Sequence, residues 1–167
     1  LAMGKTKIYN AAKEPEIVDL GNCLNSAGAK ITGLGTDVIE IEGVSKLNPT
    51  TYSVIPDRIE AGSFAIIAGI TRGELNLLNS NPKDLKAFFK KLKQTNVKVE
   101  FYNNTVKVKG VNEINSVNIQ TEPHPGFPTD LQAQFMSLMC IANGKSVIEE
   151  NIFENRFMHI PELSKMK

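Results

Sequence analysis

The 167-residue sequence predicts an α+β fold in which sheets lie outside and helices lie within. Strands that alternate apolar and polar residues predict sheets with one wet face. Two segments that are apolar nearly all round, Ile59 to Ile70 and Leu131 to Ile141, predict helices that are buried on most sides. A repeat of roughly 70 residues predicts that one small α+β unit occurs more than once.

Glycines mark the start of each copy of this repeat. Gly4, Gly73 and Gly144 each follow a predicted helical segment. After the first two glycines come a helix and then a hairpin that closes on a Gly-Val pair, at Gly43-Val44 and at Gly110-Val111. The third copy is cut short, so the sequence predicts two complete copies and the beginning of a third.

Two other predicted helices are amphipathic, because their apolar residues recur at helical spacing. The first carries Ile17, Leu20 and Leu24 on one stripe. The second spans residues 82–93, and its apolar stripe consists of Leu85, Phe88, Phe89 and Leu92. Lysines occupy the opposite side of this second helix, which we expect to face solvent.

The strands after the second amphipathic helix alternate with a period of two residues. Val97, Val99 and Phe101 alternate with charged residues in one strand, and the next strand has the same pattern. We therefore expect one face of this sheet to be packed and the other to be wet. Asn103-Asn104 joins the two strands as a two-residue turn, since asparagine tolerates the positive φ that such a turn requires.

Composition limits the classes of function. The net charge is +1, and 41% of the residues are hydrophobic and 22% are charged, as in an ordinary globular domain. A charge so close to zero provides no general attraction to nucleic acid or to a membrane surface. No apolar run is long enough to span a bilayer and no signal peptide opens the chain, so we expect a cytoplasmic protein.

The two cysteines, Cys23 and Cys140, are too far apart in sequence to form a disulfide framework or a metal knuckle. Both lie among apolar residues of predicted helices. We expect them to be small core residues rather than reactive thiols, and we predict no metal site. A reducing compartment fits this cysteine usage.

The segment that precedes the helix at 131–141 is the most informative part of the chain. Residues 123–128 contain three prolines, which stiffen the loop. Thr129 is predicted to cap the helix, because Gln132 completes a Thr-x-x-Gln capping box. Asp130 then lies in the first turn, where the helix dipole favours an ionised carboxylate. Asp130 either accepts a proton during a reaction or only complements the dipole.

Four long motifs carry a resemblance to a known family. They read EPEIVDLGNCLNSAGAKI, PDRIEAGSF, PHPGFPTDLQAQF and FENRFMHIPEL. With the rest of the chain, from Leu1 almost to Lys167, they closely resemble the bacterial UDP-N-acetylglucosamine 1-carboxyvinyltransferases, which are enolpyruvyl transferases. The resemblance implies an α/β prism, the inside-out α+β fold that the pattern of helices and strands also predicts.

The resemblance also implies how the chain is organised. Members of the family are much longer and form two lobes that close over the substrates. Residues 1–54 correspond to the last part of the first, catalytic lobe, and residues 55–167 correspond to a large part of the second lobe. We therefore expect this chain to be a middle fragment whose partner is the remainder of the same polypeptide.

The activity implied by the resemblance is a transferase reaction. The family moves the enolpyruvyl group of phosphoenolpyruvate to the 3-hydroxyl of UDP-N-acetylglucosamine and releases phosphate, which is the first committed step of peptidoglycan synthesis. It implies these two substrates, no cofactor and no metal. Addition to a tetrahedral intermediate followed by elimination needs a base for the hydroxyl, an acid for the vinyl carbon and cations around the phosphate.

Four residues match positions of interest in the family. Asp130 matches the aspartate that contacts the sugar and is the candidate catalytic base. Ile152 and Phe153 match positions that line the UDP-sugar site, and Arg156 is a candidate ligand for an anionic group of the substrate. The residues by themselves leave other interpretations open: Ile152 and Phe153 as core, and Arg156 as a tie between loops through Glu154.

Several functional groups of the family have no counterpart in this sequence. The family acid is a cysteine on a mobile loop of the first lobe, and neither Cys23 nor Cys140 stands in a matching context. The residues that hold phosphoenolpyruvate also lie outside the matching region, so the fragment alone is predicted to be inactive. His124 and His159 are expected to make structural hydrogen bonds.

Three alternatives stay open on the sequence. A sister enzyme that acts on shikimate 3-phosphate shares the fold and the chemistry. A half-length relative without activity could bind or scaffold the full enzyme. A small α/β module could bind nucleic acid through the lysine side of residues 82–93, although a solvated helix face explains these lysines better; they are Lys83, Lys86, Lys90, Lys91 and Lys93.

Overall fold

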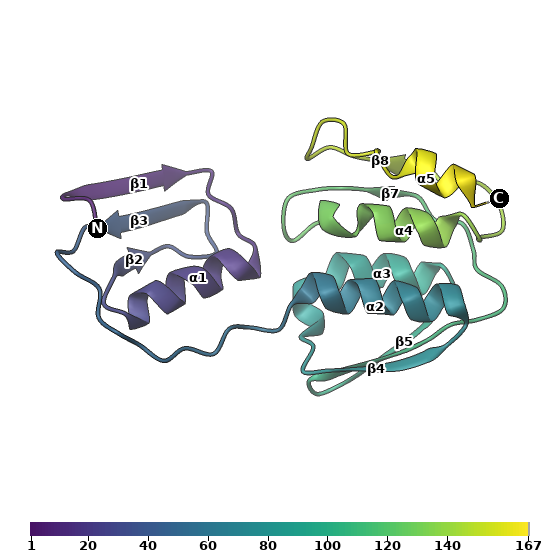
Figure 1. Cartoon of the computed structure of the whole chain (residues 1–167), viewed down its shortest axis with the longest axis horizontal. Coiled ribbons are helices and arrows are strands. Elements are labelled where there is room, and N and C mark those ends of the chain that lie inside the picture. Colours follow the sequence, from purple (N-terminus) through teal and green to yellow (C-terminus); the bar gives the residue numbers. More distant parts are fainter. Residues whose placement is uncertain (167) are drawn as a thin grey trace. The chain divides into compact units, whose positions relative to one another are not determined.

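The computed structural model describes residues 1–166, and the chain divides into two compact units, Leu1–Ile55 and Pro56–Lys167. Figure 1 shows the first unit in purple and blue and the second in teal, green and yellow. Throughout residues 1–166, no helix combines the length and the apolar character needed to cross a membrane.

The first unit consists of one helix beside a three-stranded antiparallel sheet with strand order β1-β3-β2. Its elements are β1 (Lys5–Tyr9), α1 (Pro15–Ser26), β2 (Lys30–Thr32) and β3 (Val38–Glu42). The segment after β3 returns to α1, where the Asn48 amide donates to the Ala27 carbonyl at 2.7 Å. The Tyr52 hydroxyl donates to the Asp19 carboxylate at 2.8 Å, so residues 48–52 are fixed on this helix.

The buried side of α1 differs from the predicted apolar stripe. Leu20 is 56% exposed, whereas Asp19 and Gly21 are buried. Leu34 sets this orientation, because its side chain packs directly over Gly21, where a β-carbon would lie 2.3 Å from a Leu34 methyl carbon. Asp19 tolerates burial because Tyr52 donates to its carboxylate. The predicted stripe is therefore wrong at Leu20.

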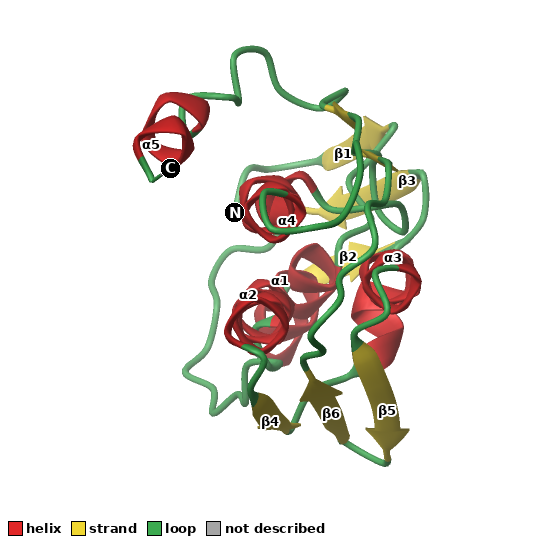
Figure 2. Cartoon of the chain, turned by 90° about the vertical axis from the view of Figure 1, so that its right-hand side faces the viewer, coloured by secondary structure: helices red, strands yellow, loops and turns green. Residues whose placement is uncertain are grey.

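The second unit contains two sheets and most of the helices. Its elements in chain order are α2 (Arg58–Thr71), β4 (Glu74–Leu78), the 3-10 turn η1 (Pro82–Leu85), α3 (Lys86–Gln94), β5 (Lys98–Tyr102), β6 (Thr105–Lys109), β7 (Ile119–Gln120), the 3-10 turn η2 (Thr129–Leu131), α4 (Gln132–Met139), β8 (Ile148–Glu149) and α5 (Ile160–Lys165). β4, β6 and β5 form an antiparallel sheet in that order, and β7 pairs with β8 in parallel. Figure 2 shows the β4-β6-β5 sheet at the bottom, with α2 and α3 above it.

The predicted repeat is confirmed by the internal topology of the two units. In each unit, the strand that opens the repeat pairs with the last strand of the hairpin, which lies in the middle of the sheet. The same backbone hydrogen bond closes both copies: Gly43 donates to Gly4, and Gly110 donates to Gly73, each at 2.8 Å. Gly144, which opens the third copy, has φ +105° and leads to β8.

The second hairpin also follows its prediction. Asn103 has φ +47°, and Tyr102 pairs with Thr105 across the Asn103-Asn104 turn. Val106 and Val108 are fully buried, while the lysines that alternate with them lie on the other face of the sheet. The period-two pattern therefore identified the inner face of β6 correctly.

The hydrophobic core of the second unit lies between the inner face of the β4-β6-β5 sheet and helices α2, α3 and α4. The predicted stripe of α3 and η1 is confirmed, since Leu85, Phe88, Phe89 and Leu92 are at most 2% exposed. Helix α2 approaches η2 and α4 through glycines: a β-carbon on Gly62 would lie 2.4 Å from a Leu131 methyl carbon, and one on Gly69 would lie 3.3 Å from a Leu138 methyl carbon. A sheet with one wet face over buried helices confirms the predicted α+β class.

The two helices that were predicted to be buried on most sides differ: every residue of α4 is buried or half-buried, whereas α2 has an exposed side. On α2, Phe64 and Ile67 are 45% and 46% exposed, while Ile66 is 2% exposed. The segment 131–141 is not one helix: it joins η2 to α4, which ends at Met139. Cys140 beyond it is exposed, so its prediction as a core residue is wrong, and Cys23 is only partly buried.

Candidate functional site

The proline-rich loop is held at both ends. The Glu122 amide donates to the Phe127 carbonyl at 3.0 Å, and the Gly126 amide donates to the Pro123 carbonyl at 2.8 Å. Phe127 anchors the loop in the core, where it is 3% exposed and its ring centroid lies 5.4 Å from that of Phe135. The position of Thr129, which follows this loop, is therefore fixed relative to the core.

Thr129 does not cap a helix, so the predicted capping box is wrong. It begins the 3-10 turn η2, and α4 starts only at Gln132. Its hydroxyl instead donates to the Glu150 carboxylate at 2.8 Å and accepts from a guanidinium nitrogen of Arg156 at 3.0 Å. Hydrogen bonds to charged partners are roughly twice as strong as neutral ones, which explains why these partners displace the backbone amide.

Asp130 is positioned by Arg156. The Nη2 atom of Arg156 lies 2.7 Å from Oδ1 of Asp130, and the two side chains are 36% and 46% exposed. The guanidinium carbon lies 5.1 Å from the centre of the Phe153 ring, within cation–π range. The ion-pair partner of Arg156 is thus Asp130 and not Glu154. Asp130, Phe153 and Arg156, three of the four predicted site residues, lie together.

Glu150 also belongs to this cluster, through its hydrogen bond with Thr129, and the sequence did not indicate it. Its Oε1 accepts from the Thr121 hydroxyl at 2.8 Å, and its Oε2 accepts from the Thr129 hydroxyl at 2.8 Å. Burial of the carboxyl favours a higher pKa, but the hydrogen bonds that it accepts outweigh burial and lower the pKa of Glu150 below its usual value. The available signal was a carboxylate directly after a short strand.

The backbone amides of Ile152 and Phe153 are engaged by the same carboxylate. They donate to Oε1 of Glu150 at 2.9 Å and 3.2 Å. The Phe153 side chain is 57% exposed, so the interpretation of Phe153 as a core residue is wrong. Ile152 is half-buried. The amides serve to fix this segment, which leaves the carbonyls and side chains for contact with a ligand.

The two histidines lie at different places in the second unit. Nε2 of His159 lies 3.2 Å from the sulfur of Met136, and burial lowers the pKa of the His159 imidazole. His124 is half-buried in the proline-rich loop, and its peptide bond to Pro125 is cis. Within residues 1–166, no three His, Cys, Asp or Glu side chains are grouped in a way that could hold a metal ion.

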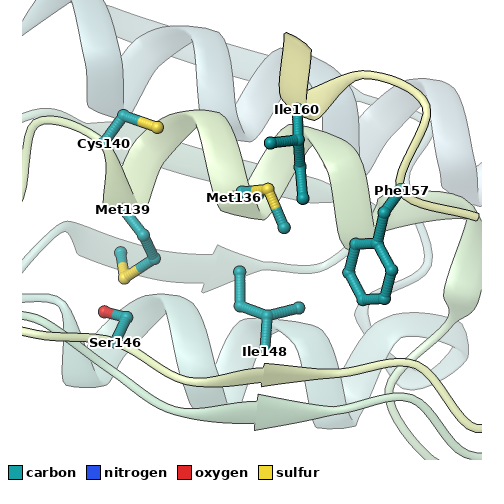
Figure 3. A pocket seen from close by; sticks show the side chains of 7 residues that line it. All are labelled: Met136, Met139, Cys140, Ser146, Ile148, Phe157 and Ile160. Carbon is teal, nitrogen blue, oxygen red and sulfur yellow. The ribbon is translucent and has the colours of Figure 1, made fainter. Parts of the chain in front are cut away.

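An apolar pocket of about 440 Å³ lies between α4, β8 and the segment that leads into α5. Figure 3 shows Met136, Ile148, Phe157 and Ile160 pointing toward one another in it. Its other lining residues are Met139, Cys140 and Ser146. Neither Asp130 nor Arg156 lines it, and the lining side chains carry no charge. This pocket is therefore distinct from the Asp130 cluster.

A second pocket, of about 480 Å³, lies beside α3 and the edge strand β5. Its lining residues are Pro82, Lys83, Lys86, Phe89, Lys90, Lys93 and Phe101. The Lys93 ammonium lies 4.4 Å from the Phe101 ring centre, and Phe89 is only 2% exposed. A platform for stacking bases needs open aromatic faces. Phe89 has no such face, and the Lys93 ammonium lies over the Phe101 ring, which is 44% exposed. The lysines Lys83, Lys86, Lys90 and Lys93 are exposed, as expected for a solvated helix face.

Comparison with known proteins identifies the family. The model of the EPSP synthase (3-phosphoshikimate 1-carboxyvinyltransferase) family matches residues 1–167. The chain belongs to the EPSP synthase family. Relatives named UDP-N-acetylglucosamine 1-carboxyvinyltransferase include that of Geotalea daltonii, 55% identical over 164 residues, and that of Orientia tsutsugamushi, 54% identical over 167 residues. These confirm the resemblance that the four motifs carry.

Solved structures of EPSP synthase-like proteins show the same fold. The enolpyruvyl transferase NikO from Streptomyces tendae matches 97% of this chain with a TM-score of 0.82 at 24% identity. The EPSP synthase of Acinetobacter baumannii matches 88% with a TM-score of 0.55 at 20% identity. At such identities the likeness speaks for the fold alone, and it confirms the enolpyruvyl transferase-like architecture.

The match covers only part of each relative. The aligned stretches are 98% and 99% of this chain but 39% and 40% of the Geotalea and Orientia proteins. The solved structures likewise extend well beyond the match, which covers 39% of NikO and 35% of the Acinetobacter enzyme. The chain therefore spans about two fifths of the length of the curated relatives that it matches.

Proposed function

We propose that this chain is the middle part of a UDP-N-acetylglucosamine 1-carboxyvinyltransferase. The complete protein transfers the enolpyruvyl group of phosphoenolpyruvate to the 3-hydroxyl of UDP-N-acetylglucosamine and releases phosphate. The observation that carries this proposal is the Asp130–Arg156 ion pair beside Phe153, at 2.7 Å, formed by residues of the PHPGFPTD and FENRF motifs. Identity of 52–55% to enzymes of that name supports it.

In this proposal Asp130 is the base that accepts the proton of the sugar hydroxyl. Among residues 1–166, the hydrogen bond to its carboxylate reaches Oδ1, from Arg156, so Oδ2 is open for the hydroxyl. As the hydroxyl oxygen bonds to the substituted carbon of phosphoenolpyruvate, its proton passes to Asp130. A separate acid protonates the vinyl carbon to complete the tetrahedral adduct. That acid lies outside the cluster seen here. In the elimination, the resulting methyl carbon loses a proton, the double bond is restored and phosphate leaves.

Ile152, Phe153 and Arg156 are proposed to bind the substrate around this base. Phe153 presents an open ring that can pack on a ring of the sugar nucleotide. Ile152 contributes its carbonyl or side chain, since its amide is bound to Glu150. Arg156 keeps donors beyond its bonds to Asp130 and Thr129, and a guanidinium suits a phosphate or carboxylate.

The wider role follows from this activity. We place residues 1–54 in the first lobe of the complete enzyme and residues 55–167 in the second. The protein acts in the cytoplasm at the first committed step of peptidoglycan synthesis, and through it in cell-wall formation, cell shape and division. Phosphoenolpyruvate is proposed to bind mainly through the remainder of the polypeptide.

The decisive experiment is Asp130→Ala in the complete protein. Loss of the base is expected to lower kcat about a hundredfold to ten-thousandfold, with folding intact by circular dichroism. Glu113→Ala, which removes an exposed carboxylate in a loop of the same unit, serves as the control and should keep wild-type turnover. Near-normal phosphate release by Asp130→Ala would remove Asp130 from the role of base.

The sister reaction is the second candidate, because the matching family model is named for 3-phosphoshikimate. A phosphate-release assay of the complete protein with each acceptor separates the two. We expect release with UDP-N-acetylglucosamine and none with shikimate 3-phosphate; the reverse would assign the sister activity. The chain of residues 1–167 by itself is expected to release no phosphate with either acceptor.

A further inference from the structure

The Glu150 carboxylate holds three separate segments of the second unit together. Thr121 follows β7, Thr129 lies in η2, and Ile152 and Phe153 follow β8. Four donors from these segments converge on the two carboxylate oxygens at 2.8 to 3.2 Å. Because the acceptor is charged, each bond is stronger than its neutral equivalent.

The hydrogen bond between Thr129 and Glu150 also fixes the position of Asp130, through Arg156. The Thr129 hydroxyl has one proton, which it donates to Glu150, so its lone pairs face the Nη1 atom of Arg156 and accept from it at 3.0 Å. That bond orients the guanidinium plane, and the neighbouring Nη2 atom then meets Asp130 at 2.7 Å. The ionised carboxylate thus sets the direction of each successive hydrogen bond.

The bonds to the Ile152 and Phe153 amides fix the other half of the candidate site. They hold the start of the segment that presents the Phe153 ring, over which the Arg156 guanidinium lies at 5.1 Å. The amide of Asn151 also donates to the Thr121 hydroxyl at 2.8 Å. Asp130 and residues 151–156 are therefore fixed relative to each other through a single side chain.

We propose that Glu150 is a positioning residue that sets the distance between the base Asp130 and the sugar-nucleotide contacts at Ile152 and Phe153. This inference rests on the proposed function. Glu150 does not touch the reacting atoms, because both of its oxygens are occupied by protein donors. Its effect is on the affinity and placement of UDP-N-acetylglucosamine rather than on phosphoenolpyruvate.

The test is Glu150→Gln in the complete protein, with Glu149→Gln as the matched control. Glutamine keeps the length of the side chain but replaces one acceptor oxygen by a donor, so at least one of the four donors loses its partner. Glu149 is the adjacent carboxylate in β8, and it is exposed. We expect the KM for UDP-N-acetylglucosamine to rise about tenfold to hundredfold in Glu150→Gln, with the KM for phosphoenolpyruvate unchanged.

Hydrogen exchange provides a readout that does not depend on turnover. In the substrate-free protein, amides in the peptide 151–157 are expected to exchange at least about tenfold faster in Glu150→Gln than in Glu149→Gln, because their acceptor is weakened. Unchanged exchange, or an unchanged KM for the sugar nucleotide, would overturn the positioning role. A wild-type protein that does not use UDP-N-acetylglucosamine would instead overturn the proposed function, while exchange still tests Glu150.

Thr129 keeps the inference testable should Glu150→Gln fail to fold. Thr129→Val removes only the link between Glu150 and Arg156, and Thr129→Ser restores the hydroxyl. We expect the KM for the sugar nucleotide to rise about tenfold in the valine variant and to return toward wild type in the serine variant. Equal kinetics of the two variants would show that the link does not position Asp130.

Discussion

The two units of the chain repeat one topology but differ in what they bury. In Leu1–Ile55, the buried apolar residues are Ala11, Ala27 and Ile39, and every residue of β1 is exposed. In Pro56–Lys167, a continuous core of aromatic and aliphatic side chains includes Phe88, Phe135 and many others at or near 0% exposure. The same strand order and the same closing hydrogen bond thus occur with and without a large core.

The difference shows that the repeat alone does not create a core. The sheet of each unit covers one amphipathic helix, but only the second unit adds α2, which packs on the sheet, and α4, which packs on α2. Because buried apolar area is the main source of stability, the second unit should be the more stable of the two. The candidate site lies on this unit, where fixed geometry is needed most.

Core truncation gives the largest expected effect. Phe135→Ala should destabilise the second unit by about 3–5 kcal/mol, since Phe135 is fully buried. Ile39→Ala in the first unit should cost about 2 kcal/mol, because the surrounding side chains are partly exposed and can collapse into the space. Urea titration followed by hydrogen exchange, with peptides assigned to each unit, measures both. Equal losses would contradict the comparison.

Substitution of Gly43 or Gly110, the glycines that donate the closing hydrogen bond of each copy of the repeat, should have a smaller effect on stability. A β-carbon on Gly110 would lie 2.3 Å from the Ala68 carbonyl oxygen and 2.6 Å from the α-carbon of Arg72, both at the end of α2. A β-carbon on Gly43 would lie 1.7 Å from the Ala2 carbonyl oxygen. Ala2 is exposed and outside regular structure, so it can move, whereas α2 is packed.

Gly110→Ala should therefore cost about 1–3 kcal/mol, the usual range for overpacking, and Gly43→Ala should cost less. Thermal unfolding of the two variants compared with wild type provides the measurement. A larger loss for Gly43→Ala would mean that the first unit is the more rigid of the two.

Acidification should lower the stability of the second unit modestly more than that of the first. The pKa of Glu150 is lowered by its hydrogen bonds, so its contribution is complete above the unfolded pKa of about 4.3 and is lost as pH falls through the folded pKa. The pKa of His159 is lowered by burial, so stability declines as pH falls from about 6.5 through the folded pKa.

Both groups belong to the second unit. In the first unit, Glu42 has a lowered pKa through Lys30 and Lys5, but it lies on the surface, where solvent weakens such pairs. When the pH is lowered from 7 to 4, we expect the urea concentration at the unfolding midpoint to decrease more for the second unit than for the first. His159→Asn should remove the part of this decline that begins as pH falls below about 6.5. An unchanged profile in that variant would assign the decline to other groups.

Local pattern in the sequence was sufficient for much of the fold. The apolar stripe of α3, the alternation in β6 and the Asn103-Asn104 turn were all predicted from residues that are neighbours in sequence. These features depend on backbone periodicity and on the φ that a residue tolerates, which are local properties. The motifs likewise identified the family and brought Asp130, Phe153 and Arg156 forward as site residues.

The errors occurred where a distant residue offered a stronger partner than a near one. Leu20 faces solvent because Leu34 fills the place over Gly21 and because Tyr52 satisfies the buried Asp19, 33 residues away. Thr129 does not cap α4, because Glu150 and Arg156, 21 and 27 residues away, bind its hydroxyl. No local pattern contains these partners.

The sequence by itself determined the class of fold, the repeat, the family and the identity of the candidate base. Only the tertiary structure decided which way α1 turns, that Arg156 pairs with Asp130, and that Glu150 holds the site together. The physical reason is that helices and strands follow from the spacing of apolar residues along the sequence. The strongest hydrogen bonds of a charged side chain instead form with the donors that the fold brings within about 3 Å.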